Sequence, residues 1–386
     1  MSQLSASGNF RHIPAAESAA GVVDLSSNDY LGLAVDTDLR RDFMRGLTVE
    51  NFLPSSSASR LLCGLQDDYQ SLEHFLQEVY GRPALLFNSG YHANTGMIAA
   101  LGGKDTLFIA DKLVHASIID GLKLSGSDFK RFRHNDTDHL RALIERYGRD
   151  YERLVIVAES VYSMDGDTAP IAELVEAKRL HPNAMLYVDE AHAVGVCGER
   201  GLGLTPGLDV DIMVGTFGKA LASMGAFAVM TETMRSFMVN RCRSLIFSTA
   251  LPPLTARWTE HVMRQSLTMD GEREALKRLA DRLSAILGTS EASHIQPYIV
   301  GDARRTVLLS EHLRADGFKV LPIRTPTVPP GTERLRFSLS AAIDPSQLAG
   351  LARALDAARA ATDPSQLVGL ARALDAARAA TDPQNI

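Results

Sequence analysis

Short apolar runs alternate with longer helix-like segments between about residues 80 and 230. Most of these runs are apolar throughout, as expected for strands that are buried on both faces of a sheet. Segments between them, such as "DHLRALIERYG" and "IAELVEAKRL", have the apolar spacing of helices. The pattern therefore predicts an α/β fold, with a mostly parallel sheet flanked by helices. The predicted strands are residues 84–90, 106–112, 154–160, 184–190, 211–218 and 226–230.

The pattern changes after about residue 250. Two long amphipathic segments, "ARWTEHVMRQSL" and "EREALKRLADRLSAIL", precede three short strand candidates, "IQPYIV", "FKVLPI" and "RLRFSLS". We expect a smaller C-terminal α+β domain here. The predicted division is an N-terminal arm at 1–40, a large domain at 41–254, a small domain at 255–362 and a duplicated tail helix at 363–386.

The C-terminus contains an internal repeat, because residues 344–362 and 363–381 differ only at Ala349 and Val368. Two units are too few for a solenoid, and each copy would make one amphipathic helix. A terminal helix that packs on the small domain needs only one copy. We interpret the second as a recent duplication without catalytic meaning; a packed helix pair or an interaction module are the alternatives. The expected buried face and N-cap residues of the first copy are Leu348, Leu351 and Leu355, with Asp344 or Ser346.

Composition narrows the class of protein. The formal net charge of −6 over 386 residues, without a run of Lys and Arg, argues against a nucleic-acid partner. No apolar window approaches the roughly 18 residues of a membrane span, and the N-terminus lacks the features of a signal peptide. Three widely separated cysteines indicate neither a disulfide framework nor a metal site. We expect a cytoplasmic protein that binds neither membrane nor metal.

Polar residues end the predicted strands, and ligands of parallel sheets bind beyond the carboxyl ends of the strands. Lys219 is the most informative of them, since desolvating an ammonium group at a buried strand end is costly. A lysine in such a place can act as a Schiff-base nucleophile, for which pyridoxal 5'-phosphate (PLP) is the usual carbonyl cofactor. The other polar strand ends are Ser89–Gly90, Asp111, Glu159–Ser160, Asp189–Glu190 and Thr216.

PLP also requires a carboxylate at its pyridinium nitrogen, and Asp189 in "YVDEAHAVG" is the candidate. His192, three residues later, could donate a hydrogen bond to the phenolate oxygen or to a substrate carboxylate. Taken alone, Asp189 is more readily explained as a helix or turn cap. The presence of Lys219 at the next strand end favours the functional reading.

The segment "NSGYHANTG" at 88–96 could form the phosphate cup, because a strand ends there and a helix pattern begins. Helix capping alone would also explain its Ser-Gly. His115, just after another strand end, is a candidate for stacking on the ring, although a single histidine is usually structural. The candidate phosphate ligands are Ser89, Gly90, Tyr91 and Thr216.

A series of motifs resembles the α-oxoamine synthases, which are PLP enzymes of fold type I. The resemblance extends from about residue 10 to 360. The motifs, in order, are "SSNDYLGL", "LLFNSGYHANTG", "DKLVHASIIDG", "FRHND", "ESVYSMDGDTAPI", "VDEAHAVGVCGERG", "GTFGKA", "IFSTALPP" and "GTERLRFSLSAA".

The resemblance implies a role for each matching position. Lys219 would hold PLP covalently and act as acid and base, Asp189 would pair with the ring nitrogen, and His115 would stack on the ring. Gly90, Tyr91 and Thr216 would bind the phosphate, and Ser248 and Thr249 would reach the phosphate of a neighbouring subunit. The residues expected around the ring hydroxyl are Ser163, His192 and Glu159, and those expected at the substrates are Arg11, Asn28 and Arg336.

Within the family, the sequence is most similar to the biotin-pathway branch. This implies a homodimer with shared active sites that condenses L-alanine with a pimeloyl thioester, either pimeloyl-CoA or a pimeloyl carrier protein. Sister enzymes of the 5-aminolevulinate synthase, 2-amino-3-ketobutyrate CoA ligase or serine palmitoyltransferase type are the alternatives. A non-catalytic scaffold is a further alternative, which the combination of Lys219, Asp189, His192, His115 and Arg336 disfavours.

Overall fold

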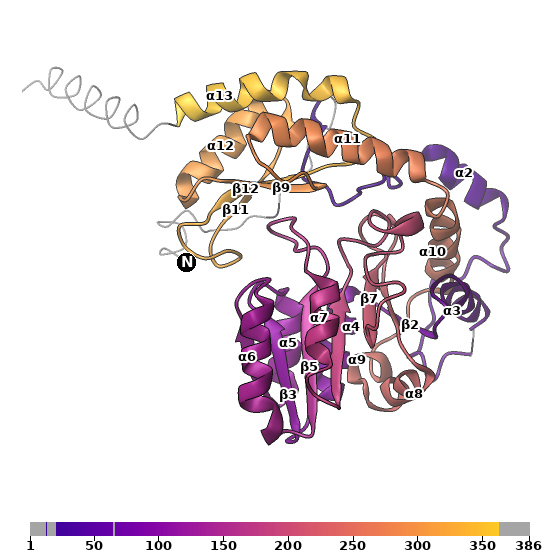
Figure 1. Ribbon diagram of the computed structural model, residues 1–386. Coiled ribbons are helices and arrows are strands. Elements are labelled where there is room, and N and C mark those ends of the chain that lie inside the picture. Colours follow the sequence, from indigo (N-terminus) through magenta and orange to yellow (C-terminus); the bar gives the residue numbers. More distant parts are fainter. Residues whose placement is uncertain (1–12, 14–20, 65, 363–386) are drawn as a thin grey trace, which may run out of the picture. The chain divides into compact units, whose positions relative to one another are not determined.

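The computed structural model describes residue 13 and residues 21–64 and 66–362 (Figure 1). These form two compact units. One unit comprises residues 28–276, and the other comprises the described parts of residues 1–27 and 277–386.

The unit of residues 28–276 is built on a seven-stranded sheet with the strand order β2-β8-β7-β6-β5-β3-β4. Strand β8 runs antiparallel to its neighbours β2 and β7, whereas all the other pairings are parallel. The predicted α/β fold with a mostly parallel sheet is therefore confirmed. The strands are β2 (Ala84–Phe87), β3 (Thr106–Asp111), β4 (Asp128–Phe132), β5 (Arg153–Glu159), β6 (Ala184–Asp189), β7 (Ile212–Thr216) and β8 (Ala226–Val229).

Helices cover both faces of this sheet, which explains why most of its strands are apolar throughout. On β3, Phe108 packs into one core and the next residue, Ile109, packs into the other. Helices α4 (Gly90–Leu101), α5 (Ala116–Leu124), α8 (Glu232–Arg241) and α9 (Arg243–Ile246) contribute to the first core. Helices α6 (Thr137–Tyr147) and α7 (Ile171–Lys178) contribute to the second.

The remaining helices of this unit are α2 (Thr37–Arg45), α3 (Asp67–Tyr80), α10 (Pro253–Ser266) and the short η1 (Gly148–Asp150) and η2 (Glu199–Gly201). Helix α11 (Asp270–Leu287) begins in this unit and ends in the other. Helix α10 packs against α3, and this contact keeps the chain beyond residue 254 within the large unit. The division at 40, 254 and 362 that the sequence suggested stays a prediction.

The second unit contains an antiparallel sheet of β11 (Leu321–Ile323), β12 (Arg334–Ser338) and β9 (Ile295–Ile299), with β12 in the centre. Strand β1 (Val23–Asp24) pairs in parallel with β10 (Phe318–Lys319), so the N-terminal segment is tied to this unit. Helices α12 (Ala303–Ala315) and α13 (Leu351–Ala361) contact each other, and η3 (Pro345–Gly350) leads into α13. The small α+β arrangement expected from the sequence is present.

The first copy of the repeat forms η3 and α13, as predicted. The Asp344 carboxylate accepts a hydrogen bond from the Ser346 N–H at 2.7 Å, and the Gln347 side chain accepts one from the Asp344 N–H at 2.8 Å. This reciprocal pair is a capping box. Leu348, Leu351 and Leu355 are all buried. The second copy, residues 363–381, lies outside the described residues.

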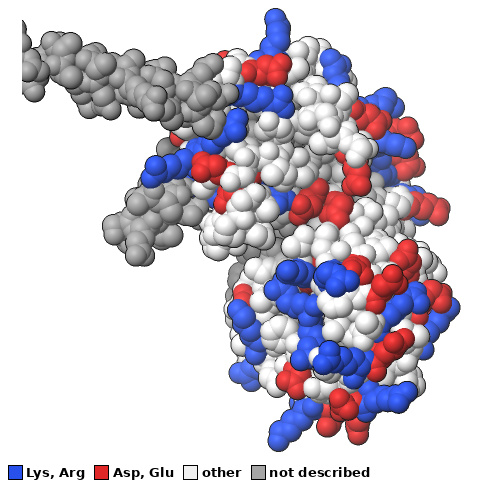
Figure 2. All heavy atoms as spheres, turned by 60° about the vertical axis from the view of Figure 1, so that its left-hand side comes forward, with Lys and Arg blue, Asp and Glu red and all other residues white. Residues whose placement is uncertain are grey.

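Within the described part of the chain, no helix is both long and apolar enough to cross a membrane. The same residues contain no group of three or more His, Cys, Asp or Glu side chains that could hold a metal ion. On the face shown in Figure 2, side chains of both charges lie next to each other. This mixture agrees with the modest net charge of −6.

Candidate active site

The carboxyl ends of five strands meet around one pocket in the unit of residues 28–276. The pocket has about 490 Å³ of open space. Lys219 comes from the end of β7, Asp189 from β6 and Glu159 from β5. The sequence pattern predicts that these side chains lie together, because parallel strands bring their carboxyl ends to one edge of a sheet. The lining residues are Gly90, Tyr91, Asn94, His115, Ser117, Glu159, Asp189, Ala191, His192, Thr216 and Lys219.

Lys219 lies in the tight connection between β7 and β8, where the Ala222 N–H donates to the Lys219 carbonyl at 2.9 Å. Small residues are required here. Gly225 has a φ of +105°, and a Cβ at that position would lie 2.6 Å from the Leu251 side chain. The run of glycine and small residues after the strand therefore lets the chain turn back closely, which leaves the half-buried lysine at the pocket.

Asp189 is buried, with 5% of its surface exposed, and both of its carboxylate oxygens accept hydrogen bonds. The Ala191 N–H donates to Oδ1 at 2.9 Å, and the Asn94 amide donates to Oδ2 at 2.7 Å. The Asn94 amide is fixed in turn, because the Tyr187 hydroxyl donates to its Oδ1 at 2.7 Å. These bonds hold the carboxylate in one orientation at the pocket.

His115 is the N-cap residue of α5 and lies at the pocket beside Glu159. Its backbone N–H donates to the Glu159 carboxylate, and its Nδ1 lies 2.8 Å from the Ser117 hydroxyl. Ser117 also accepts from the Asn94 amide at 2.9 Å, so Asn94 connects the surroundings of His115 with those of Asp189. Burial lowers the pKa of His115, against the opposing effect of Asp189 and with the support of nearby Lys219. The neutral imidazole is favoured.

Glu159 is 3% exposed and lies close to a second carboxylate. Burial raises the pKa of Glu159 well above its usual range, the charge of Asp189 raises it further, and Lys219 opposes the shift. The site therefore combines two carboxyl groups in different settings, since Asp189 accepts two hydrogen bonds at its oxygens whereas Glu159 is strongly desolvated.

The first turn of α4 contributes Gly90 and Tyr91 to the lining of the pocket. Ser89 caps the helix by accepting from the His92 N–H at 3.2 Å. The N–H groups of Gly90 and Tyr91 belong to the first turn, where no carbonyl of the helix can accept from them. A Cβ at Gly90 would lie 3.9 Å from the Thr216 side chain, so the glycine backbone and the Thr216 side chain lie side by side. This end of a helix favours an anionic group such as a phosphate.

Tyr30 connects two of the predicted residues. Its hydroxyl lies 2.6 Å from Nδ1 of His192 and donates to Oδ1 of Asn28 at 3.0 Å. Tyr30 is fully buried. Asn28, predicted to line the amino-acid site, is therefore one hydrogen-bonded side chain away from the pocket residue His192.

Other predicted residues lie outside the lining of this pocket. Ser163 lies in the loop after β5, and Ser248 and Thr249 lie between α9 and α10, where the Asn88 amide donates to the Thr249 carbonyl at 2.6 Å. Arg336 belongs to β12 in the other unit and is 3% exposed. Arg11 lies outside the described residues. The roles expected for these five residues stay predictions.

Four residues of the hydrogen-bond network at this site were not predicted from the sequence, namely Asn94, Ser117, Tyr187 and Tyr30. Two spacings could have revealed the first and third. Asn94 follows Gly90 by four residues in a helix, and Tyr187 precedes Asp189 by two residues in a strand, so each pair shares a face. Tyr30 carries no such signal, because its partner His192 is 162 residues away in the sequence.

Comparisons with known proteins agree with this geometry. The family model described as aminotransferase class I and II matches residues 20–355. A putative 8-amino-7-oxononanoate synthase of Pasteurella multocida is 48% identical over 331 residues, which are 83% of this chain and 86% of that protein. The 8-amino-7-oxononanoate synthase of Haemophilus ducreyi is 46% identical over 351 residues, 86% of this chain and 91% of that protein. The chain belongs to the α-oxoamine synthases, within the aminotransferase class I and II family.

Solved structures of other α-oxoamine synthases share the fold. A PLP-bound serine palmitoyltransferase from S. paucimobilis superposes with a TM-score of 0.82 at 32% identity, covering 88% of each chain. An 8-amino-7-oxononanoate synthase from Francisella tularensis gives a TM-score of 0.73 at 25% identity, covering 86% of this chain and 96% of that one. The resemblance and the fold type I architecture expected from the sequence are both confirmed.

Proposed function

We propose that this α-oxoamine synthase condenses L-alanine with a pimeloyl thioester to give 8-amino-7-oxononanoate, CO2 and the free thiol, as a step of biotin biosynthesis. One observation carries the proposal. Relatives that are 43% to 48% identical over most of the chain bear the name 8-amino-7-oxononanoate synthase, some of them as putative members. The pocket supports it, because its residues have the chemistry that a decarboxylative condensation at an amino-acid Cα requires.

The donor set of the pocket fits PLP. The pocket is lined by four kinds of group. These are a half-buried lysine, a buried carboxylate with both oxygens hydrogen-bonded, a partly buried imidazole and the N-terminus of a helix. When bound, PLP supplies an electron sink for the pair of electrons released at the amino-acid Cα. Lys219 would hold the cofactor covalently and, once released by the incoming amino acid, would take the Cα proton on Nζ.

The other pocket residues would bind and orient. Asp189 would keep a proton on the ring nitrogen, as a fixed anion can. The neutral His115 ring would lie on the ring face, and His192 and Glu159 would lie near the ring hydroxyl with Ser163. The phosphate would bind at Ser89, Gly90 and Tyr91 together with Thr216.

The two substrates would use three residues between them. Arg336 would hold the carboxylate of the amino acid with a two-pronged ion pair, which the planar guanidinium group is suited to form. Asn28 would line the amino-acid site, within reach of His192 through Tyr30. Arg11 would contact the acyl substrate. Each of these roles depends on the proposed reaction.

The proposed assembly is a homodimer with shared active sites. Ser248 is partly exposed and Thr249 exposed, and neither lines the Lys219 pocket of its own chain among the described residues. Both would instead bind the cofactor phosphate in the neighbouring subunit. A cytoplasmic location, expected from the sequence, also stays a prediction.

A thiol-release assay tests the proposed reaction. The purified protein, loaded with PLP, is incubated with L-alanine, glycine or L-serine, each paired with pimeloyl-CoA, succinyl-CoA or palmitoyl-CoA. We expect thiol release and a product of the mass of 8-amino-7-oxononanoate only with L-alanine and the pimeloyl thioester. Lys219→Ala is the control for release that does not depend on the site. Release with glycine and succinyl-CoA alone would refute the proposal.

A serine palmitoyltransferase activity is the second candidate. Its support is the TM-score of 0.82 and 32% identity with a serine palmitoyltransferase structure. The relatives at 46% and 48% identity favour the alanine reaction over it, since similarity to them is greater. The pair of L-serine and palmitoyl-CoA in the same assay distinguishes the two. Replacing pimeloyl-CoA by a pimeloyl carrier protein identifies the acyl carrier.

A further inference from the structure

His134 lies between two carboxylates that come from different segments of the chain. Its Nδ1 is 3.0 Å from Oδ1 of Asp111, and its Nε2 is 2.7 Å from Oδ2 of Asp167. An ionised carboxylate can only accept hydrogen bonds, whereas a neutral imidazole has a single N–H. Both contacts are hydrogen bonds only when both ring nitrogens carry a proton. With both carboxylates ionised, the geometry favours an imidazolium cation.

The two carboxylates that face His134 favour the same charge. Burial alone would lower the pKa of His134, but the hydrogen bonds and charges of Asp111 and Asp167 raise it to about 10. The ring of Tyr162 packs edge-on against the imidazole, with the centroids 4.4 Å apart. The Asn135 side chain also donates to Asp167, at 2.8 Å. No cation opposes the imidazolium in the contacts described for it.

Asp111 links this cluster to His115. It is the last residue of β3 and is fully buried. One oxygen accepts from the Leu113 N–H at 2.7 Å, and the other accepts from the Asn135 N–H at 2.9 Å. The first of these bonds shapes the turn that leads from β3 to His115, the first residue before α5. An uncompensated charge on Asp111 would therefore disturb the segment that presents His115.

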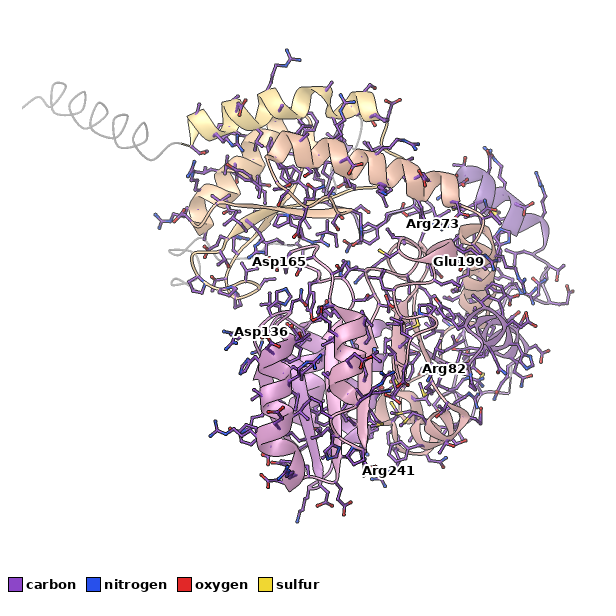
Figure 3. All side chains as sticks on the ribbon, in the orientation of Figure 1. Arg82, Asp136, Asp165, Glu199, Arg241 and Arg273 are labelled. Atoms are coloured by element: carbon purple, nitrogen blue, oxygen red, sulfur yellow. The ribbon has the colours of Figure 1, made fainter. Side chains whose placement is uncertain are left out.

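Asp167 links the cluster to the loop after β5. Its backbone carbonyl accepts from the Tyr162 N–H at 3.0 Å, and Val161 and Thr168 form an antiparallel bridge. This loop begins directly after Glu159 and contains Ser163. Figure 3 shows Asp136, at the start of α6, and Asp165, in this loop, near the same end of the sheet. His134 therefore connects the loop to the end of β3.

We propose that His134 is a positioning residue, a permanent cation that ties the turn before His115 to the loop that carries Ser163. This rests on the proposed function only in so far as His115 and Ser163 bind PLP. The two segments are already joined at the pocket, where the His115 N–H donates to Glu159. The contacts of His134 with Asp111 and Asp167 link the same two segments a second time. With both links present, we expect His115 and Ser163 to move together.

The charge of His134 is tested directly by nuclear magnetic resonance of the ring nitrogens in the PLP-loaded protein. We expect both nitrogens of His134 to remain protonated through neutral pH and to titrate with a midpoint near the pKa of about 10. Asp167→Asn should move that midpoint down, because it removes one of the two carboxylates. A ring that titrates near 6.5, the ordinary histidine value, would overturn the proposal.

The positioning role is tested with His134→Gln, which keeps hydrogen-bonding capacity but has no charge. We expect about 10- to 100-fold weaker PLP retention in equilibrium dialysis, by analogy with the loss of a side chain that orients a metal ligand. The KM for the amino acid should change less than kcat. His74→Gln, at an exposed histidine of α3, is the matched control and should leave both unchanged.

Two further outcomes are decisive. His134→Gln with wild-type PLP retention, whether or not its melting temperature falls, would show a purely structural residue and overturn the proposal. If His134→Gln does not fold, Asp167→Asn takes its place in the dialysis and should weaken PLP retention. Neither the nitrogen titration nor the dialysis of PLP involves the acyl donor, so a failed thiol-release assay together with a shifted PLP affinity would count against the proposed reaction alone.

Discussion

Asn94 donates a hydrogen bond to Asp189 at 2.7 Å, from α4 to the end of β6. The same amide nitrogen donates to Ser117, whose hydroxyl lies 2.8 Å from the His115 ring. One buried side chain thus sets the positions of two groups, one proposed to bind the nitrogen of the PLP ring and the other proposed to lie on its face. With 1% of its surface exposed, Asn94 has no water to replace these partners.

Replacing Asn94 by alanine is therefore expected to weaken PLP binding. A hydrogen bond to a charged group contributes about 1.5–3 kcal/mol, which corresponds to roughly 10- to 150-fold in the dissociation constant. Tyr187→Phe is the matched control, because it removes only a neutral hydrogen bond to Asn94 and should cost about 0.5–1.5 kcal/mol. Equilibrium dialysis of PLP measures both. Wild-type affinity in Asn94→Ala would contradict the proposed role of Asp189.

The central strands and the polar ends of the sheet could be predicted from the sequence because burial on both faces leaves a strong signal. Strands β5 and β6 are apolar up to Glu159 and Asp189, so both the strand and its functional end were visible. Strand β4 was missed, since Phe132 is its one buried residue. An edge strand with charged side chains does not differ in pattern from a loop.

Contacts between distant segments could not be predicted from the sequence. Tyr30 and His192 meet only because the chain before α2 returns to the end of β6, and no local pattern encodes that meeting. His134 was noticed only as part of the motif "FRHND". Its charge follows from two carboxylates that lie 23 and 33 residues away, which a sequence pattern cannot bring together.

Asp189 and His115 should differ in importance. Asp189→Asn keeps the shape but removes the anion that would support charge development, so we expect kcat to fall by about 10²–10³. His115→Ala removes stacking, which is worth about 0.5–1.5 kcal/mol, or up to roughly tenfold. Steady-state thiol release with the preferred substrates measures both. An equal or larger loss in His115→Ala would indicate that His115 does more than stack.

His134 should give the protein a pH-dependent stability. Its pKa is raised from 6.5 to about 10 by folding, so its pairing stabilises the protein fully below pH 6.5. This contribution is lost as the pH rises from 6.5 to about 10, because the unfolded chain releases the proton first. The difference in melting temperature between wild type and His134→Gln should therefore shrink over this range. A constant difference would show that the histidine is not charged by its partners.

Shared active sites predict complementation between two inactive variants. Lys219→Ala removes the nucleophile from its own pocket, while a double variant with Ser248→Ala and Thr249→Ala would damage the pocket of its partner. Random mixing of the two would put both defects in one site of each mixed dimer and leave the other site intact. About a quarter of the wild-type activity should return. Activity that stays at the sum of the separate variants would argue against sharing.

The first copy of the terminal repeat should matter for stability, and the second should not matter for activity. Leu351→Ala removes a fully buried side chain of α13 and should lower the free energy of unfolding by about 2–5 kcal/mol. Arg353→Ala, at an exposed position of the same helix, is the control and should change it by less than about 0.5 kcal/mol. Urea unfolding measures both.

Deleting residues 363–386 should leave kcat and the free energy of unfolding unchanged, because residues 344–362 already supply a capped helix with its leucines buried. The matched experiment is deletion from residue 344 onward, which removes both copies and should destabilise the protein. Loss of thiol release in the shorter deletion would show that the repeated tail takes part in function, and would revive the interpretation of the tail as an interaction module.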